Sequence, residues 1–285
     1  MKFVSFSAEG RSSYGIARDG GVWDLGARVP KAADLKSYLR LRADGGAGPA
    51  PLGSTIDFAD GEFTYLPVIP NPDKILCVGV NYDEHRKETG RAEAAYPTIF
   101  TRFADTLVAH GAPIRLPAVS TALDYEGELA VIIGRPGFRV PEAEAMSIVA
   151  GYTGFNDATL RDWQRHSHQF TPGKNFPDTG ALGPELVTAD ELPLERLVGC
   201  RIETRLNGQL VQSALLGEML FSIPTVIAYL SSFTPLSPGD VIATGTPGGV
   251  GSKREPPLFM KAGDAVEVSV ESVGRLRNPI APEER

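Results

Sequence analysis

The stretch LDYEGELAVIIG, residues 123–134, places acids at alternate positions directly before an apolar run. In a β-strand, side chains alternate between the two faces, so Asp124, Glu126 and Glu128 are expected to share one face. The apolar run indicates that part of this acidic face lies near the interior, where unpaired carboxylates are costly or take up protons. A bound cation would remove that cost. A solvated strand edge with scattered acids is the alternative.

A third acid follows a second strand-like segment. Residues 151–157 read GYTGFND, so Asp157 would stand at a strand end, well placed to complete a site with Glu126 and Glu128. Oxygen ligands with no cysteine nearby favour Mg²⁺, Mn²⁺ or Ca²⁺ over zinc. Asp157 could instead be a simple helix cap. Its pairing with the two strand acids favours the metal interpretation.

His85 and Glu88 lie three residues apart in NYDEHRKE, residues 81–88, which would place them on one helical face. A carboxylate that orients an imidazole produces a general base that works near neutral pH. An ordinary surface salt bridge is the alternative.

Two loops rich in glycine and proline carry further candidates. Lys174, in residues 171–184, could bind a carboxylate or stabilise an enolate oxygen, or could simply face solvent. Residues 244–251, TGTPGGVG, resemble a phosphate loop but lack the Gly-Lys-Ser/Thr ending. Their backbone N–H groups and the Thr246 hydroxyl could hold a substrate carboxylate, and a merely structural turn is the alternative.

Composition narrows the class of protein. The chain has 285 residues, 42% of them hydrophobic, and a formal net charge of −7, so we expect a folded protein that does not bind nucleic acid. The amino-terminal residues lack an apolar signal core and no later segment is long enough to span a membrane, which predicts a cytoplasmic location without a membrane partner. Cys77 and Cys200 form no CxxC pair, so we interpret them as buried structural thiols.

The pattern of elements predicts a mixed, mainly β fold. Strand-like runs outnumber helices, without a regular βαβ alternation. Asn207-Gly208 between two alternating runs predicts a hairpin. Helices are predicted near residues 32–41, 142–148, 159–168 and 222–232. Residues 47–54 are rich in Gly, Ala and Pro, and residues 67–72 are punctuated by prolines, so we predict a small domain at 1–70 and a catalytic domain at 71–285.

Five motifs in order resemble the fumarylacetoacetate hydrolase family over roughly residues 72–280. They are NYDEHRKE (81–88), DYEGELAVIIG (124–134), GFNDATLRDWQ (154–164), the Lys174 loop ending in LGP (174–184) and PGDVIATGTPGGVG (238–251). The resemblance implies a β-sandwich roll, preceded here by a small N-terminal α+β domain, and a homodimer. It also implies one Mg²⁺ or Mn²⁺ per chain, held by Glu126, Glu128 and Asp157.

The resemblance further implies that His85 and Glu88 form a catalytic dyad on a segment that orders over bound substrate, and that Lys174 points into the site. The residues expected to contact substrate are Tyr82, Arg102, Arg161, Gln164 and Thr246. Arg102 is a departure, because many relatives have lysine at the end of the segment that reads PTIFTR here, residues 97–102. Since arginine prefers bidentate carboxylate contacts, we expect Arg102 to bind a distal substrate carboxylate. The run after Lys174 also differs from that of many members.

These residues favour cleavage of a C–C bond in a small anionic keto acid. The expected substrate is an acylpyruvate of the fumarylpyruvate or maleylpyruvate type, hydrolysed to pyruvate and a dicarboxylate in aromatic-compound catabolism. Oxaloacetate decarboxylation, isomerisation of hydroxymuconate-type dienes and ureidoglycolate lyase activity are alternatives, because one fold supports several reactions. A non-catalytic, metal-stabilised binding protein is a further alternative, against which the presence of a base argues.

Overall fold

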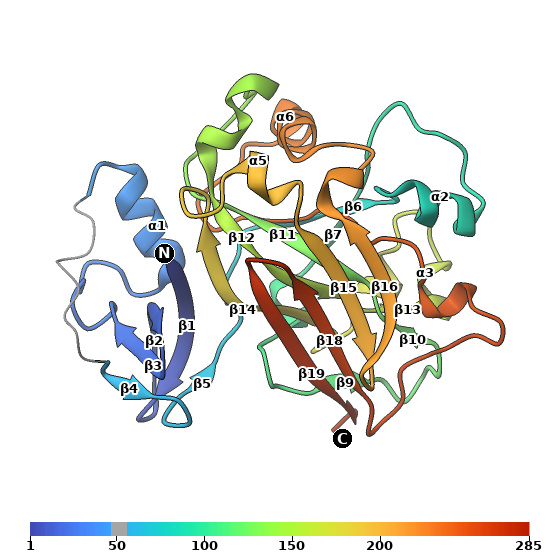
Figure 1. Ribbon diagram of the computed structural model, residues 1–285, viewed down its shortest axis with the longest axis horizontal. Coiled ribbons are helices and arrows are strands. Elements are labelled where there is room, and N and C mark those ends of the chain that lie inside the picture. Colours follow the sequence, from blue (N-terminus) through green and yellow to red (C-terminus); the bar gives the residue numbers. More distant parts are fainter. Residues whose placement is uncertain (47–55, 285) are drawn as a thin grey trace.

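The computed structural model describes residues 1–46 and 56–284, and two large sheets dominate it (Figure 1). The larger sheet has 12 strands. Its path runs through β4 (Phe58–Ala59), β3 (Gly21–Asp24), β2 (Arg11–Arg18), β1 (Lys2–Ala8), β14 (Gly180–Thr188), β12 (Val149–Asp157), β11 (Gly127–Ile133), β17 (Val241–Ala243), β6 (Ile75–Gly79) and β7 (Thr98–Arg102), with β5 (Thr64–Tyr65) on β1 and β8 (Leu107–Val108) on β14.

The smaller sheet packs against the central strands of the larger one. Its order is β16 (Gln209–Leu215), β15 (Arg201–Leu206), β18 (Ala265–Val270), β19 (Gly274–Pro282) and β9 (Ile114–Leu116). Strands β15, β18 and β19 contact β11, β12 and β14. A third sheet of two strands pairs β10 (Leu123–Asp124) with β13 (Thr159–Leu160). The mixed, mainly β fold class predicted from the sequence is confirmed.

Helices are short and lie around the sheets (Figure 1). The α-helices are α1 (Leu35–Ala43), α2 (Asp83–Thr89), α3 (Arg161–Gln164), α4 (Thr171–Lys174), α5 (Leu194–Leu197) and α6 (Ile223–Phe233). The 3-10 helices are η1 (Ala104–Thr106), η2 (Glu142–Ile148), η3 (Leu216–Glu218) and η4 (Gly251–Lys253). Among the described residues, no helix has the length and apolar character needed to cross a membrane.

Strand β11 is buried on both faces. Leu129, Val131 and Ile133 pack into one core cluster. Ala130 and Ile132 pack into the other, on the opposite face of the sheet. This two-sided burial explains why the run is continuously apolar, and it places the acids at the start of the strand beside the core rather than at a solvated edge.

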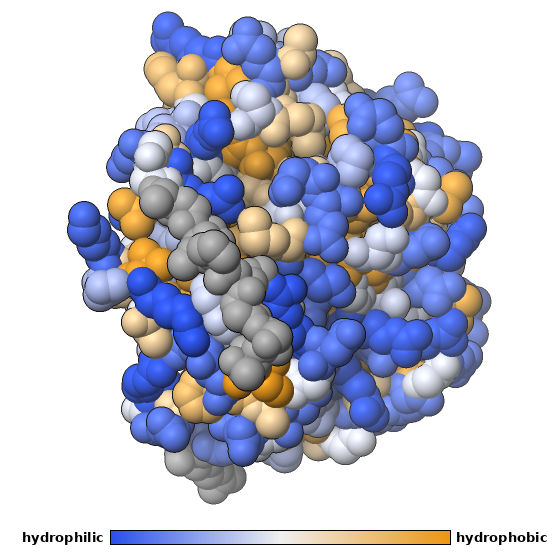
Figure 2. All heavy atoms as spheres, turned by 60° about the vertical axis from the view of Figure 1, so that its left-hand side comes forward, coloured by the Kyte–Doolittle hydropathy of each residue, from blue (hydrophilic) through white to orange (hydrophobic). Residues whose placement is uncertain are grey.

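The N-terminal strands continue the larger sheet. Strand β1 pairs with β14 in antiparallel register, so residues 1–46 and 56–66 form a lobe beside the main body (Figure 1). Figure 2 turns this lobe toward the viewer, and the molecular face that it shows is largely hydrophilic, with apolar residues in small groups. The domain boundary near residue 70 stays a prediction. The Gly-, Ala- and Pro-rich stretch at 47–54 lies outside the described residues.

Local signals account for several elements. The side chain of Asp34 accepts a hydrogen bond from the Ser37 N–H at 2.7 Å, which satisfies one free N–H group of the first turn of α1. Ser222 caps α6 in the same way. The hairpin turn between β15 and β16 has positive φ at both central residues, 52° at Asn207 and 83° at Gly208. The helices predicted near 32–41 and 222–232, and the hairpin, are confirmed.

The other two predicted helices have different outcomes. Residues 142–148 are helical with the predicted bounds, as the 3-10 helix η2. The helix predicted over residues 159–168 is reduced to α3, because Thr159 and Leu160 pair with β10 instead. Strand pairing occupies the backbone of these two residues, so the helix begins only at Arg161.

Gly127 lies between two of the acids, where β11 approaches the smaller sheet. A Cβ atom here would lie 2.0 Å from Thr204 Oγ1 and 3.3 Å from Val268 Cγ1. We expect Gly127→Ala to lower the free energy of unfolding by about 1–3 kcal/mol, because overpacking forces neighbouring groups apart. Urea denaturation measures the loss. Adding Thr204→Ala removes the nearest atom and should recover part of it, whereas wild-type stability in the single variant would contradict a tight fit.

Candidate metal centre and active site

Three buried acids meet where β11 begins and β12 ends. Glu126 is 5% exposed, Glu128 2% and Asp157 0%. One carboxylate oxygen of each lies within 4.8 Å of the others. Antiparallel pairing of β11 with β12 produces this arrangement, and the Asp157 N–H donates to the Glu126 carbonyl at 2.8 Å. The acids that the sequence singled out as metal ligands therefore form one cluster.

The charges of this cluster fit a divalent cation. Burial, together with the nearby charges of Asp157 and Glu126, raises the pKa of Glu128 well above its usual range. Glu128 Oε2 accepts one hydrogen bond, from the Gly245 N–H at 2.8 Å. A carboxylate buried beside two others needs more compensation than one N–H group provides. Carboxylate oxygens are the donors that hard divalent cations prefer.

Lys174 and Arg161 compensate part of the negative charge of the buried carboxylates. Lys174, 1% exposed, forms ion pairs with Glu126 and Asp157, and Arg161 Nη1 lies 2.7 Å from Glu126 Oε1. Burial works to raise the pKa of Glu126, but the charges of Lys174, Arg161 and His85 outweigh it and lower that pKa to about 2. Burial likewise opposes the charge of Lys174, and Asp157 and Glu126 reverse the effect, so the pKa of Lys174 is raised. Both carboxylate and ammonium are charged at neutral pH.

Arg102 lies behind the acid cluster rather than in contact with the cavity. Its Nη1 donates to Asp157 Oδ1 at 2.6 Å and to the Ala158 carbonyl at 3.0 Å, and its Nη2 donates to Thr179 Oγ1 at 2.8 Å. The side chain is 0% exposed. The expectation that Arg102 binds a distal substrate carboxylate is corrected, because its donors hold Asp157 and the adjoining backbone.

Helix α2 presents His85 and Glu88 to the same region. His85 is 6% exposed, and its Nδ1 lies 2.6 Å from Glu88 Oε1. Glu88 Oε2 accepts from the Gly249 N–H at 2.9 Å, which fixes the carboxylate from its other side. With Nδ1 bonded to Glu88, Nε2 is the ring nitrogen left for proton transfer. A pair with a buried imidazole and a partly buried carboxylate, held by the neighbouring turn, differs from the solvated salt bridge considered as the alternative.

A cavity of about 300 Å³ opens onto these groups. The sequence-predicted residues that line it are His85, Glu126, Glu128, Arg161, Gln164, Lys174 and Thr246. Tyr82 does not line it: this side chain is 2% exposed and packs in the core, so its predicted contact with substrate is corrected. The Tyr82 hydroxyl is buried without a hydrogen-bond partner among the described residues.

The glycine-rich turn binds the protein's own carboxylates. Its Gly245 and Gly249 N–H groups donate to Glu128 and Glu88. The Thr246 hydroxyl donates to the Gly127 carbonyl at 3.0 Å and accepts from Gln212 Nε2 at 2.8 Å. Thr246 therefore borders the cavity with its hydroxyl already engaged, and the turn orders the site rather than offering several free N–H groups.

Three cationic residues at the cavity were not identified from the sequence. Arg91, Arg165 and Lys253 line it together with the predicted residues. Each lies just beyond the end of a motif, Arg91 after residues 81–88, Arg165 after 154–164 and Lys253 after 238–251, and the motifs themselves do not include them. Only their shared position in space distinguishes them from ordinary surface cations.

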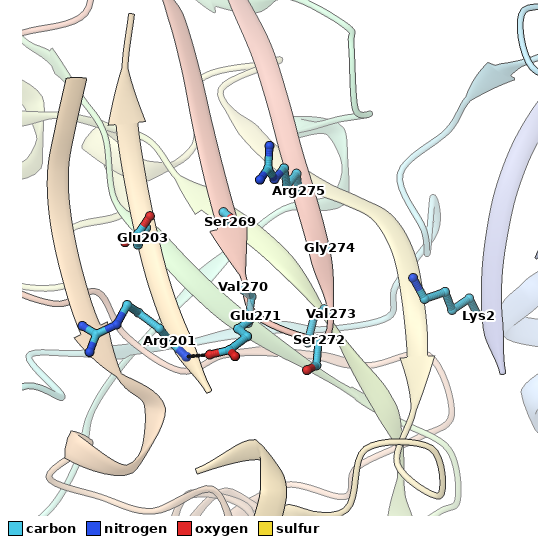
Figure 3. Close-up of a pocket in the computed structure, with 10 residues that line it drawn as sticks. All are labelled: Lys2, Arg201, Glu203, Ser269, Val270, Glu271, Ser272, Val273, Gly274 and Arg275. Atoms are coloured by element: carbon cyan, nitrogen blue, oxygen red, sulfur yellow. Dashed lines mark hydrogen bonds between the residues drawn. The ribbon is translucent and has the colours of Figure 1, made fainter. Parts of the chain in front are cut away.

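A larger hollow of about 510 Å³ lies at the end of the smaller sheet (Figure 3). Lys2 in its lining forms an ion pair with Glu185, and the backbone N–H of Arg201 donates to the Glu271 carboxylate. Within the described part of the chain, the group of acids able to hold a metal lies instead at Glu126, Glu128 and Asp157. The chemistry is therefore assigned to the smaller cavity.

Comparison with known proteins agrees with this geometry. Residues 74–281 match the family model described as fumarylacetoacetate (FAA) hydrolase C-terminal. The chain belongs to the fumarylacetoacetate hydrolase family. It is 37% identical, over 98% of its length and 90% of the relative, to a Xenopus laevis protein named oxaloacetate tautomerase fahd2, mitochondrial. It is 43% identical to oxaloacetate tautomerase YisK of Bacillus subtilis, over 74% of this chain and 71% of the relative.

A solved structure of the family superposes closely. The fumarylacetoacetate hydrolase EaFAH from psychrophilic Exiguobacterium antarcticum has a TM-score of 0.86 and 34% sequence identity, and the match covers 99% of this chain and 100% of that one. Members of this family are enzymes that act on keto-acid substrates. The family and fold predicted from the sequence motifs are confirmed, and the reaction is not decided by membership alone.

The acid cluster predicts the effect of removing one charge. We expect Glu128→Gln, which keeps the shape of the side chain, to weaken the binding of one divalent cation per chain by more than about tenfold, or ~1.4 kcal/mol. Titration calorimetry with Mg²⁺ and Mn²⁺ measures the affinity. Glu144→Gln, at an exposed acid in η2, is the matched control and should bind as the wild type does. Undiminished affinity in Glu128→Gln would sink the assignment.

The position of Arg102 predicts a loss of stability. Arg102→Met removes one partner of a fully buried ion pair, so we expect the free energy of unfolding to fall by about 3 kcal/mol, at the lower end of the usual cost because Lys174 still faces Asp157. Arg102→Lys keeps the charge and should lose less. Urea denaturation measures both variants. Normal stability together with an altered substrate preference would restore the substrate-binding interpretation.

Proposed function

We propose that this chain is a divalent-metal-dependent enzyme that interconverts the keto and enol forms of oxaloacetate, with Mg²⁺ or Mn²⁺ as the metal. One observation carries the proposal: His85 lines the same cavity as Glu126 and Glu128, while Glu88 is bonded to the His85 ring and Asp157 adjoins the two acids just outside the lining. Proton transfer next to a carbonyl group needs a base and a centre that withdraws electrons from the oxygen. The relatives named oxaloacetate tautomerase support the choice of substrate.

The acids and the cations have different roles at the carbonyl group of the substrate. Glu126, Glu128 and Asp157 would hold the metal, which supplies an electrophilic centre that polarises a carbonyl oxygen. Lys174 and Arg161 lie against these acids and line the cavity. Their positive charges would stabilise the negative charge that develops on the substrate oxygen during proton transfer.

His85 would move the proton. Its Nε2 takes a proton from C3 of keto-oxaloacetate, and the C–H electron pair forms the C2–C3 double bond while the C2 oxygen becomes negative. Protonation of that oxygen gives the enol, and the reverse steps give the keto form. Glu88 keeps the imidazole oriented through Nδ1 and stabilises the imidazolium that forms.

Hydrolysis of an acylpyruvate, the reaction predicted first from the sequence, is the second candidate. The 34% identity to a solved structure titled fumarylacetoacetate hydrolase favours hydrolysis as the reaction type, without naming an acylpyruvate as substrate. The same His85 would then activate a water molecule instead of removing a carbon-bound proton. Oxaloacetate decarboxylation shares the substrate of the first candidate but releases pyruvate and carbon dioxide. The three reactions therefore differ in products that can be measured separately.

The decisive experiment follows the enol form directly. Crystalline enol-oxaloacetate is dissolved with Mg²⁺ and the protein, and the decay of its ultraviolet absorbance is compared with the uncatalysed decay. We expect His85→Ala and Glu88→Ala each to lower kcat by a factor of about 10²–10⁴, and the double variant to be little worse than either, because the two residues act as a unit. Lys87→Ala, an exposed residue of α2, is the matched control.

Other outcomes reassign the reaction. Pyruvate is measured in the same samples and with a panel of acylpyruvates. Pyruvate release from an acylpyruvate that outpaces enol decay would identify a hydrolase, and release from oxaloacetate would identify a decarboxylase. Near wild-type turnover in either single variant would return His85 and Glu88 to a structural salt bridge. A chelator should abolish whichever activity is found, and added metal should restore it.

A further inference from the structure

We propose that Arg91, Arg165 and Lys253 form a second anion subsite in the cavity, which binds the distal carboxylate of a dicarboxylic 2-oxo acid. We call these three residues the outer cations. The inference rests on the proposed 2-oxo acid chemistry, and it names the residues that select a dicarboxylate over a monocarboxylate.

The outer cations come together from three separate segments. Arg91 follows α2, Arg165 follows α3 and Lys253 ends η4, yet all three line the cavity that contains the acid cluster. Each is solvent-exposed, in contrast to the buried Lys174. The fold therefore gathers positive charge on the solvent side of the cavity.

The inner cations already have acidic partners, and the outer cations do not. Lys174 is paired with Glu126 and Asp157, and Arg161 with Asp124 and Glu126. Over residues 1–46 and 56–284, no carboxylate lies within 4.0 Å of a nitrogen of any outer cation. Their charge is available to a ligand.

An aromatic pair links the inner cation Lys174 to the outer cation Arg91. Lys174 Nζ lies 4.8 Å from the centroid of the Phe100 ring, and the Phe100 and Phe170 rings are 5.8 Å apart. Arg91 Cζ lies 5.1 Å from the centroid of Phe170, a cation–π contact that restrains the guanidinium. The two rings also line the cavity. A short carbon chain with a carboxylate at each end matches an apolar wall with a cation at each end.

The charge balance favours a doubly negative ligand. The lining includes five cationic side chains, Arg91, Arg161, Arg165, Lys174 and Lys253, against two carboxylates, Glu126 and Glu128. Asp124 and Asp157 pair with Arg161 and Lys174 from outside the lining, so the unpaired positive charge lies on the outer cations. The whole chain carries a formal net charge of −7, so this local excess runs against the overall composition. A divalent metal would increase the excess. A monocarboxylate bound at the metal would leave the outer cations without a partner, whereas a dicarboxylate occupies both ends.

A binding experiment tests the subsite without turnover. L-Malate and L-lactate share a 2-hydroxy acid group and neither carries an enolisable ketone, but only malate has a distal carboxylate. We expect the Mg²⁺-loaded protein to bind malate about tenfold more tightly, each of the three exposed cations contributing about a twofold effect. The triple variant Arg91→Gln, Arg165→Gln, Lys253→Gln should lose this preference and keep its lactate affinity, which also reports that it is folded. Calorimetry measures both ligands.

A matched kinetic experiment uses oxaloacetate and its 4-methyl ester, which lacks the distal charge at nearly the same chain length. The triple variant should raise KM for oxaloacetate about tenfold with kcat near the wild-type value, and should leave the ester unaffected. Lys87→Gln, an exposed cation outside the cavity, is the control and should change neither substrate. High salt should weaken the malate preference, because the outer cations are exposed.

The outcomes separate the subsite from the reaction. Equal affinity of the wild type for malate and lactate, or equal weakening of both in the triple variant, would overturn the subsite. A malate preference that the triple variant loses supports it, even in a protein that leaves enol-oxaloacetate unchanged, and in that case the proposed reaction alone fails. Equal loss of oxaloacetate and ester turnover in the triple variant would also count against the outer cations.

Discussion

The mutual repulsion of buried carboxylates at the junction of β11 and β12 is the constraint on which the site depends. Glu126, Glu128 and Asp157 are buried within a few ångströms of one another, and each needs a positive partner. Lys174 on α4 pairs with Glu126 and Asp157, and Arg102 on β7 pairs with Asp157, whereas Glu128 has, among the described residues, only the Gly245 N–H. The groups that prepare the cavity for a cation are thus the same groups that hold these elements together.

The glycine-rich turn serves three carboxylates at once. Its N–H groups donate to Glu128, Glu88 and, from Gly251, to Asp124 at 2.8 Å. These acids belong respectively to the acid cluster, the His85–Glu88 pair and the support of Arg161. A Cβ atom on Gly251 would lie 1.9 Å from the Leu258 carbonyl oxygen, so only glycine fits there. The composition that resembles a phosphate loop therefore reflects close backbone packing against acidic side chains.

The features that the sequence predicted correctly depend on contacts between residues close together in the chain, and those that it missed depend on contacts between distant segments. The Asn207-Gly208 turn and the His85–Glu88 spacing are local, and the sequence predicted their geometry. The acids do not share one continuous strand as predicted, because Asp124 lies on β10, Glu126 precedes β11 and Glu128 lies on β11. Arg102 was misjudged, because its direction depends on the burial of Asp157 from another strand. Helix α3 was overextended for a similar reason, since pairing with β10 removes its first residues. The outer cations carry no motif, so only the folded chain brings them together.

The two-sided burial of β11 has a consequence for how the strand finds its partner. A strand that is apolar on both faces buries almost as much apolar surface when its pairing register is shifted by one residue. The hydrophobic effect alone therefore specifies its register only weakly. A shift of one residue would turn the carboxylate of Glu128 toward the opposite core cluster, away from the turn N–H groups that receive it. The carboxylate of Glu128 therefore favours the native register of β11. Burying its charge costs free energy in the native site, and the same burial would cost more in the shifted sheet, where the turn N–H groups are out of reach.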